Sequence, residues 1–293
     1  MNDGKIFARI AAPLLVVCCL AENSDAVFTP IRFEARRITN PPVIDGDLSD
    51  SVWNQAQPMK VFYAYQSGGD PPAAATSARI LWDEDYLYVG LEMADVDIRS
   101  ACALRGSCGR DANLFQGDVI ELFVKESTAS ARYHEFEWSP LGEEFDARFD
   151  RVRFGAPGIG WNSGMRSAVQ VRGTVDNPSD SDRGWTVESA IPLADFELSS
   201  IEVGSQWRFT VARYDYYNAP PDPREELMML TRGDPDAPNA GVTSGFHTYE
   251  IYDILEFTVV PEPSSLCSAL SLVFVTGLSR RVLQLVVNPQ SIF

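Results

Sequence analysis

Short runs in which apolar and polar residues alternate make up most of the chain between residues 31 and 257. The runs are Ile31–Ile38, Ala78–Trp82, Tyr86–Met93, Asp118–Val124, Tyr133–Trp138, Phe145–Phe149, Ala168–Val175, Gly184–Pro192, Trp207–Tyr216 and Tyr249–Phe257. A period of two residues is typical of β-strands. Turn residues separate the runs at short intervals, as in antiparallel sandwiches. The sequence therefore predicts an all-β, antiparallel β-sandwich that forms a single domain over residues 27–259.

Helix signals are few in this chain. Ser49–Ala56 and Leu193–Phe196 are the two candidates. Asn177–Asp182 and Ala219–Glu226 are rich in Pro, Asp and Ser, so we expect exposed loops there. The acidic turn Asp83–Asp85 joins two apolar runs and predicts a hairpin.

The N-terminus has the pattern of an export signal. Lys5 and Arg9 precede the apolar run Ile10–Leu20, and Ser24 and Ala26 are small residues at a cleavage site. The apolar run is too short to span a bilayer. We expect residues 1–26 to be a signal peptide and the mature protein to be exported.

The C-terminus carries a second targeting pattern over residues 260–293. "VPEPSS" (Val260–Ser265) precedes the apolar run Leu266–Leu278 and the pair Arg280 and Arg281. An apolar run followed by arginines is typical of a segment halted in a membrane. The pattern resembles the PEP-CTERM sorting tail of bacterial surface proteins, although Val282–Phe293 continues past the arginines. The resemblance implies membrane sorting machinery as a partner and a location at the cell envelope or surface, anchored through this tail.

Two cysteines, Cys102 and Cys108, lie in the mature chain and flank the small polar segment "ALRGS". In an exported protein this spacing predicts a disulfide that closes the loop. Two free thiols are the alternative. A zinc site is not expected, because no further Cys and no nearby His complete one.

The net charge of −17 argues against a nucleic-acid partner, because an acidic surface repels the phosphate backbone. It leaves cations and neutral polar ligands open as partners. The charge pattern does not indicate an oligomeric state.

No motif of a common enzyme class is complete in the sequence. In "GWNSG" (Gly160–Gly164) the serine stands one place too late for a nucleophile elbow. The chain has two histidines, His134 and His247, so haem ligation stays one alternative. Glu135 and Glu137 share a strand face and leave a glycosidase open, but with 41 acidic residues we expect a solvated face. The sequence predicts a protein without catalytic activity.

The segment Val43–Ala56, "VIDGDLSDSVWNQA", crowds aspartates before a tryptophan. An EF-hand that begins at Asp45 needs Gly at its sixth position and Glu at its twelfth, where this chain has Asp50 and Ala56. An EF-hand is therefore excluded. We expect Asp47 or Ser49 to cap a short helix and Trp53 to face the core.

Seven segments occur in the order typical of family 9 carbohydrate-binding modules, which this chain resembles over residues 42–257. They are "PVIDGDLSDSVWNQA", "ARILWDEDYLYVGLEMAD", "GDVIELFV", "YHEFEWSPLGEEFDARF", "GWTVESAIPLADF", "GSQWRFTVARYD" and "FHTYEIYDILEF". The resemblance implies a β-sandwich that holds a sugar between two aromatic rings, often with structural calcium. An oligosaccharide or polysaccharide is then the expected ligand.

The resemblance places Phe115 and Phe246 at the positions of the two sugar-binding tryptophans of the family. Glu137 and Ser139 stand where the family has a basic residue and an asparagine. Hydrogen-bond donors of the family are thus replaced by a carboxylate, which is an acceptor. Trp161, in a glycine-rich loop, is a further candidate for the site. These substitutions leave open a structural surface or matrix protein that keeps the fold without binding sugar.

Calcium ligands are expected where oxygen donors gather in the sequence. Asp95, Asp97 and Asp118 are the candidates, because carboxylates are the side chains that calcium prefers. The expected metal is structural calcium, and no other cofactor is predicted.

Overall fold

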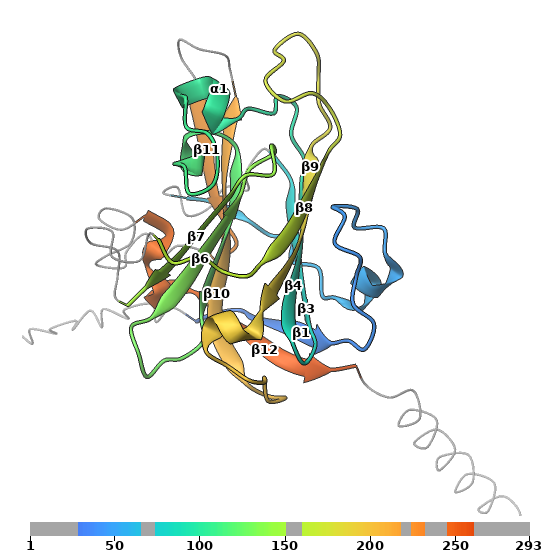
Figure 1. Cartoon of the computed structure of the whole chain (residues 1–293), viewed down its shortest axis with the longest axis vertical. Coiled ribbons are helices and arrows are strands. Elements are labelled where there is room, and N and C mark those ends of the chain that lie inside the picture. Colours follow the sequence, from blue (N-terminus) through green and yellow to red (C-terminus); the bar gives the residue numbers. More distant parts are fainter. Residues whose placement is uncertain (1–28, 66–73, 151–159, 218–223, 232–244, 261–293) are drawn as a thin grey trace, which may run out of the picture.

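The computed structural model describes residues 29–65, 74–150, 160–217, 224–231 and 245–260 (Figure 1). The predicted signal peptide, residues 1–26, and all of the predicted sorting tail except Val260 lie outside the described residues. None of the helices in the described part of the chain is long and apolar enough to span a membrane.

Twelve strands of the described residues belong to one hydrogen-bonded sheet. They are β1 (Arg32–Arg37), β2 (Tyr63–Ala64), β3 (Thr76–Trp82), β4 (Tyr86–Met93), β5 (Val119–Lys125), β6 (Tyr133–Trp138), β7 (Glu144–Phe149), β8 (Arg166–Val171), β9 (Trp185–Pro192), β10 (Gln206–Tyr217), β11 (Arg224–Met229) and β12 (Asp253–Val259). The helical segments are short: α1 (Ala101–Arg105) and the 3₁₀ turns η1 (Ser51–Gln55), η2 (Leu114–Gln116), η3 (Leu193–Phe196), η4 (Gly245–His247) and η5 (Tyr249–Ile251).

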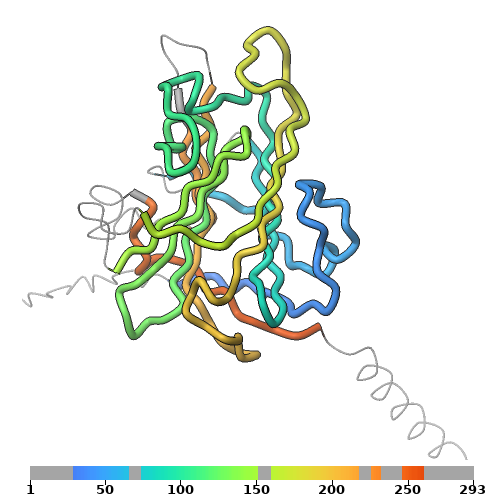
Figure 2. Tube along the Cα trace, in the orientation of Figure 1, coloured from blue at the N-terminus to red at the C-terminus, as the bar shows by residue number. Residues whose placement is uncertain are grey.

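The sheet curls so that its two halves face each other (Figures 1 and 2). The strand order is β7-β6-β5-β10-β12-β1-β3-β4-β9-β8, with β11 and then β2 added beside β10. Strands β7, β6, β5 and β10 form one layer and strands β3, β4, β9 and β8 form the other, while β12 and β1 connect them. The predicted all-β sandwich is confirmed, as one sheet folded over rather than two separate sheets.

Strand β1 is the exception to antiparallel pairing. It runs parallel to both of its neighbours, β12 and β3, with Arg32 opposite Ile254 and Arg36 opposite Leu81. Alternation of residues indicates a strand but not its direction, so this pairing could not be predicted from the run itself.

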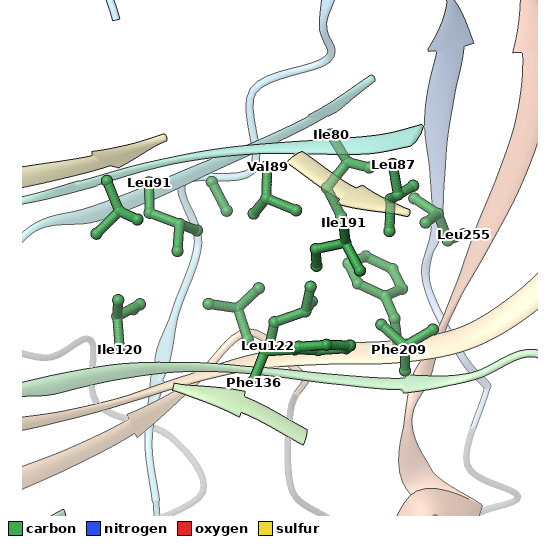
Figure 3. Packing of buried hydrophobic residues seen from close by; sticks show 14 of the residues in the cluster. Ile80, Leu87, Val89, Leu91, Ile120, Leu122, Phe136, Ile191, Phe209 and Leu255 are labelled. Atoms are coloured by element: carbon green, nitrogen blue, oxygen red, sulfur yellow. The ribbon is translucent and has the colours of Figure 1, made fainter. Parts of the chain in front are cut away.

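The apolar core fills the space between the two layers (Figure 3). Val89 and Leu91 point from one layer toward Ile120, Leu122 and Phe136 of the other, and all five side chains are fully buried. These residues occupy alternate positions of their strands, because successive side chains of a strand point to opposite faces. The core therefore follows the period of two that predicted the strands.

Three predicted elements differ from the structure. Residues 224–229 form strand β11 instead of an exposed loop, because they pair with β10. The helix expected over Ser49–Ala56 is a single 3₁₀ turn. The strand expected over Tyr249–Phe257 begins only at Asp253, after the turn η5.

The segment Val43–Ala56 packs on the outer face of β4 and β9. No side chain caps its 3₁₀ turn, contrary to the prediction; instead the Asp50 carboxylate accepts a hydrogen bond from the Val43 N–H at 2.9 Å. Trp53 is buried, in a cluster on this outer face and not in the core between the layers where it was expected, and its Nε1 donates to Glu188 Oε1 at 2.6 Å. Glu188 also accepts hydrogen bonds from the backbone N–H groups of Asp45 and Gly46. One buried carboxylate thus anchors the whole segment.

Asp253 fixes the beginning of β1 from the start of β12. Its Oδ1 accepts a hydrogen bond from the Ile31 N–H at 2.7 Å, and its Oδ2 lies 3.0 Å from the Thr231 hydroxyl. Burial raises the pKa of Asp253 to about 6. The protonated form is therefore favoured by folding, so its stabilising contribution is present at low pH and is lost as the pH rises through about 6.

We expect protonation of Asp253 to add on the order of 1 kcal/mol to the free energy of unfolding between pH 7.5 and pH 5. Asp253→Asn can accept from Ile31 and donate to Thr231 without titrating, so its stability should depend on pH by about that much less. Urea unfolding of both proteins at the two pH values measures the difference. Equal pH dependence in the two proteins would contradict the assignment.

Candidate functional site

One face of the β7-β6-β5-β10-β11 layer, on the side away from the sandwich core, carries three glutamates; we call it the carboxylate face. The strand register places Glu137 opposite Glu121, and Glu135 is two residues from Glu137 on the same strand. One carboxylate oxygen of each residue lies within 4.8 Å of the others. All three side chains are buried, at 1–4% exposure.

The alternating strand β6 is therefore buried on both faces, contrary to the solvated face that its glutamates predict. The turns η4 and η5 contribute to this cover. His247 Nδ1 lies 2.9 Å from the Tyr133 hydroxyl, and its Nε2 lies 3.7 Å from Glu135. Burial raises the pKa of Tyr252 on this face, and the negative charges of Glu135 and Glu121 raise it further. A segment about a hundred residues further along the chain thus decides that these carboxylates are not solvated.

Four aromatic residues at one end of the carboxylate face form what we call the aromatic group: Tyr65, Phe115, Tyr214 and Phe246. The Tyr214 ring centroid lies 6.2 Å from that of Phe115 and 5.4 Å from that of Phe246, and Phe246 lies 4.7 Å from Tyr65. Phe246 is 3% exposed, whereas the other three rings are partly exposed. The structure brings the two predicted phenylalanines into one group, but Tyr214 contacts both of them.

The aromatic group also contains a polar atom. The Tyr65 hydroxyl is buried and has no hydrogen-bond partner among the described residues. Its burial raises the pKa of Tyr65, so the hydroxyl keeps its proton at neutral pH. An unsatisfied buried hydroxyl is costly, so this end of the aromatic group contributes less to stability than its packing alone would give.

Ser139, the second polar candidate, belongs to the turn between β6 and β7. Its Oγ accepts hydrogen bonds from the backbone N–H groups of Leu141 and Glu143 and lies 3.2 Å from the Glu143 carboxylate. The side chain is fully buried. Ser139 therefore shapes the hairpin that presents Glu137.

Trp161 lies on the opposite side of β6 from Glu137. Its ring centroid is 5.2 Å from that of His134 and 6.2 Å from that of Phe136, and Trp161 packs against the core cluster that contains Phe136. The structure does not bring Trp161 together with Phe115 and Phe246. His134 and His247 are likewise separated by the sheet, because His247 packs on the carboxylate face.

A second buried acidic cluster contains Asp95, Asp118 and Asp215. Asp97 lies outside it and pairs with Arg99 at 2.8 Å. Arg213, fully buried, donates from Nη2 to Asp95 at 3.0 Å and to Asp215 at 3.1 Å. The chain itself thus contributes the positive charge that these carboxylates need.

This cluster does not fit a calcium ion while Arg213 holds its position. Calcium takes about six to eight oxygen ligands. Both Asp118 oxygens already accept backbone hydrogen bonds, from the N–H groups of Arg99 and Tyr216. Burial and the neighbouring carboxylates raise the pKa of Asp118; burial, only partly offset by Arg213, raises the pKa of Asp215 to about 6. Calcium binding at Asp95, Asp97 or Asp118 stays a prediction.

The structure joins the sulfurs of Cys102 and Cys108 in a disulfide. The bond closes the loop that follows α1, and this loop reaches the hairpin of β6 and β7. There the Gly109 N–H donates to Glu143, and Arg110 pairs with Glu144 at 2.6 Å. Because η2 with Phe115 follows the same loop, the disulfide restricts the segment that carries one ring of the aromatic group.

Sequence reasoning missed Tyr65, just after β2, and three residues of β10: Tyr214, Arg213 and Asp215. Tyr214 was assigned only to an alternating strand. The signal that could have identified the two charged residues is Arg213-x-Asp215, a charged pair on one face of a strand whose neighbouring residues are apolar. Buried charges of this kind are rare unless they are paired.

Comparisons with known proteins identify the family of the chain and proteins of similar fold. A family model described as "Carbohydrate family 9 binding domain-like" matches residues 44–232, which is more than half of the 293 residues. Exoglucanase XynX of Acetivibrio thermocellus is 26% identical over 164 residues, which are 56% of this chain and 13% of that protein. Endo-1,4-beta-xylanase C of Paenibacillus barcinonensis is 26% identical over 212 residues, which are 72% of this chain and 16% of that protein. The chain therefore spans only a small part of the length of these relatives.

Solved structures of similar fold include two of a family 9 carbohydrate binding module from Caldicellulosiruptor kristjanssonii. The complex with cellotriose has a TM-score of 0.52 at 15% identity and covers 79% of this chain and 95% of that one. The complex with glucose has a TM-score of 0.51 at 15% identity, and the match covers 79% of this chain and 97% of that one. At 15% identity, this similarity shows that the chain has the same fold as these structures.

Proposed function

Because the chain belongs to the carbohydrate family 9 binding domain-like family, we propose that it binds a neutral oligosaccharide or polysaccharide without cleaving it. The proposed site is the aromatic group beside the carboxylate face. The observation that carries this proposal is the contact of the partly exposed Phe115 and Tyr214 rings at one end of a face that also holds Glu121 and Glu137. Relatives of the same fold that are solved with cellotriose and with glucose support the ligand class.

The chemistry of the proposed site suits a sugar ring. The faces of a sugar ring present C–H groups that pack on aromatic rings, while its hydroxyls need hydrogen-bond partners. The partly exposed Phe115 and Tyr214 rings offer the aromatic surface. The glutamates are acceptors, so a ligand that reaches them must donate through its hydroxyls. No proton transfer is required for binding.

We expect Tyr214→Ala and Phe115→Ala each to weaken binding by about tenfold, the effect of losing one stacked aromatic contact. Phe246 is less suitable for this test, because its side chain is buried and its removal also destabilises the fold. Isothermal titration with cellotriose and xylotriose, and pull-down with insoluble cellulose and xylan, measure the change.

Tyr217→Ala is the matched control. Tyr217 lies on the same strand, is 42% exposed, and points to the other side of the sheet from Tyr214. The Tyr217→Ala protein should bind the glycans with the affinity of the unsubstituted protein. No binding by the unsubstituted protein to any of these glycans would refute the proposal. Equal affinities of the Tyr214 and Tyr217 variants would place the site elsewhere.

A structural surface or matrix role is the second candidate function. The burial of Phe246 and of all three glutamates favours it, because a covered face has little room for a ligand. This role predicts that deleting the gene alters the surface architecture of the cell while glycan retention is unchanged. Glycoside hydrolysis is the third candidate function. Release of reducing sugar from xylan by the purified protein would establish it.

The proposed location is the cell envelope or surface, with residues 1–26 as the export signal and residues 260–293 as the sorting and anchoring tail. The sequence patterns at the two ends support this proposal. Fractionation of cells that express the full chain, compared with a chain ending at Val260, tests it. The full chain should stay with the envelope, whereas the shorter one should be released.

A further inference from the structure

The outer face of the other layer, β3-β4-β9-β8, contains a hollow of about 540 Å³. It is lined among others by Pro41, Asp83, Asp85, Tyr86, Tyr88 and Arg166. The residues of this outer face belong to a hydrophobic cluster separate from the sandwich core and from the carboxylate face. A volume of this size is within the range of small-molecule sites and accommodates a sugar ring.

The strand register brings Tyr88 and Arg166 to the same outer face of this layer. Tyr88 on β4 lies opposite Ala190 on β9, and Ala190 lies opposite Arg166 on β8. Ala190 itself is fully buried, and the segment Pro41–Ile44 completes the lining of the hollow. Arg166 reaches across it, and its guanidinium lies 5.1 Å from the centroid of the Tyr86 ring.

The turn at one edge of the hollow is held rigidly. Asp83 Oδ2 accepts a hydrogen bond from the Tyr88 hydroxyl at 2.6 Å, and its Oδ1 accepts from the backbone N–H groups of Asp85 and Tyr86, both at 2.8 Å. Burial, more than this hydrogen bond, raises the pKa of Tyr88, so its hydroxyl stays protonated. The tyrosine wall of the hollow is thus preorganised.

Two charged groups at the hollow keep hydrogen-bonding capacity. Arg166 is exposed and forms no ion pair among the described residues, and the exposed Asp85 carboxylate accepts no side-chain hydrogen bond in that part of the chain. The hollow thus combines an aromatic wall, a donor and an acceptor. The net charge of −17 disfavours anionic ligands. This combination suits a neutral ring with several hydroxyls.

We propose that this hollow is a second saccharide-binding site, which takes a neutral sugar unit against Tyr86 with hydroxyls bonded to Arg166 and Asp85. Its ligand class rests on the proposed function, but its residues are separate from the aromatic group. The two sites lie on opposite outer faces of the sandwich. One chain therefore binds two glycan strands and links them together.

Selective ¹⁵N labelling of tyrosine tests both sites in one sample of the full chain. Tyr86 and Tyr88 report the hollow and Tyr214 reports the aromatic group, with signals assigned through Tyr→Phe variants. The probes are cellotriose, xylotriose and maltotriose. We expect at least one trisaccharide to shift the Tyr86 and Tyr88 signals. Shifts at Tyr214 alone reject the second site and keep the proposed function. Shifts at Tyr86 and Tyr88 alone keep the second site and reject the proposed site at the aromatic group. No shift at any of these tyrosines rejects both sites.

Arg166→Ala shows whether the hollow itself binds the sugar. Arg166 is exposed, so its removal should leave the melting temperature nearly unchanged. We expect the dissociation constant obtained from the Tyr86 signals to rise about tenfold, the effect of losing one charged hydrogen bond. The constant obtained from the Tyr214 signal should not change. Arg172→Ala is the matched control, because Arg172 is an exposed arginine just beyond β8 that pairs with Glu92. Equal affinities of the two variants at the Tyr86 signals overturn the proposal.

Discussion

Replacing Arg213 by methionine is expected to lower the free energy of unfolding by about 3–5 kcal/mol at pH 7.5. The substitution leaves Asp95, Asp118 and Asp215 buried together without their cation. Arg213 also donates to the Ala94 carbonyl at 2.9 Å and to the Thr76 hydroxyl at 3.2 Å, and both partners lose that donor. Urea unfolding followed by tryptophan fluorescence measures the change.

The loss of unfolding free energy in the Arg213→Met protein should be smaller at pH 5 than at pH 7.5. The raised pKa values of Asp118 and Asp215 mean that both carboxyls take up protons more readily than exposed ones as the pH falls. Protonation removes the repulsion that Arg213 otherwise offsets. Arg32→Met is the matched control, since Arg32 pairs with Glu256 at the surface and should cost less than about 1 kcal/mol. A similar loss in both variants, or a loss independent of pH, would show that the buried charge is not the cause.

Addition of calcium to the Arg213→Met protein separates two roles of this cluster. Recovery of the lost stability would mean that the carboxylates accept a divalent cation once the guanidinium is absent. No recovery would mean that the backbone hydrogen bonds of Asp118 keep the oxygens from a metal. Differential scanning calorimetry with calcium and with magnesium compares the two cases.

Phe136→Ala is expected to lower the free energy of unfolding by about 3–5 kcal/mol through the cavity it leaves. Phe136 points from its own layer into the space between the layers (Figure 3), and its ring is 6.0 Å from that of Phe196 and 6.4 Å from that of Trp138. Its neighbours come from different strands and turns, so they cannot close the gap together. Phe136→Leu should cost clearly less, because it leaves a smaller cavity.

Val43→Ala is the control for this core substitution. Val43 is 63% exposed, so its truncation should change the stability by less than about 0.5 kcal/mol. Chemical unfolding of the three variants gives the order of their costs. A Phe136→Ala protein as stable as Val43→Ala would show that the core between the layers is not what holds them together.

The elements that the sequence predicted well are those with a local signal. The hairpin around Asp83–Asp85 and strands β5 and β6 formed where the alternation places them, because that period needs no information from elsewhere in the chain. Strand β11 was missed, since residues 219–226 have the composition of a loop and Arg224–Met229 become a strand only by pairing with β10.

The candidate site was predicted only in outline. Phe115 and Phe246 were expected from a resemblance, and both belong to the aromatic group. Tyr214, which contacts both rings, was not expected, because its role depends on the register of β10 beside β5. Trp161 was expected near them and instead packs against the core cluster across the sheet.

The sequence alone determined most of the β-strands, the period that assigns each side chain to one of two faces, and the pair of cysteines that can close a loop. Tertiary structure decided which faces are covered. The glutamates of β6 could point to water or to protein, and the turns η4 and η5, about a hundred residues further on, place His247 against them. It also decided that β1 lies parallel between β12 and β3 and that Arg213 lies among three aspartates. Such contacts join segments far apart in the chain, and no local period of residues encodes them.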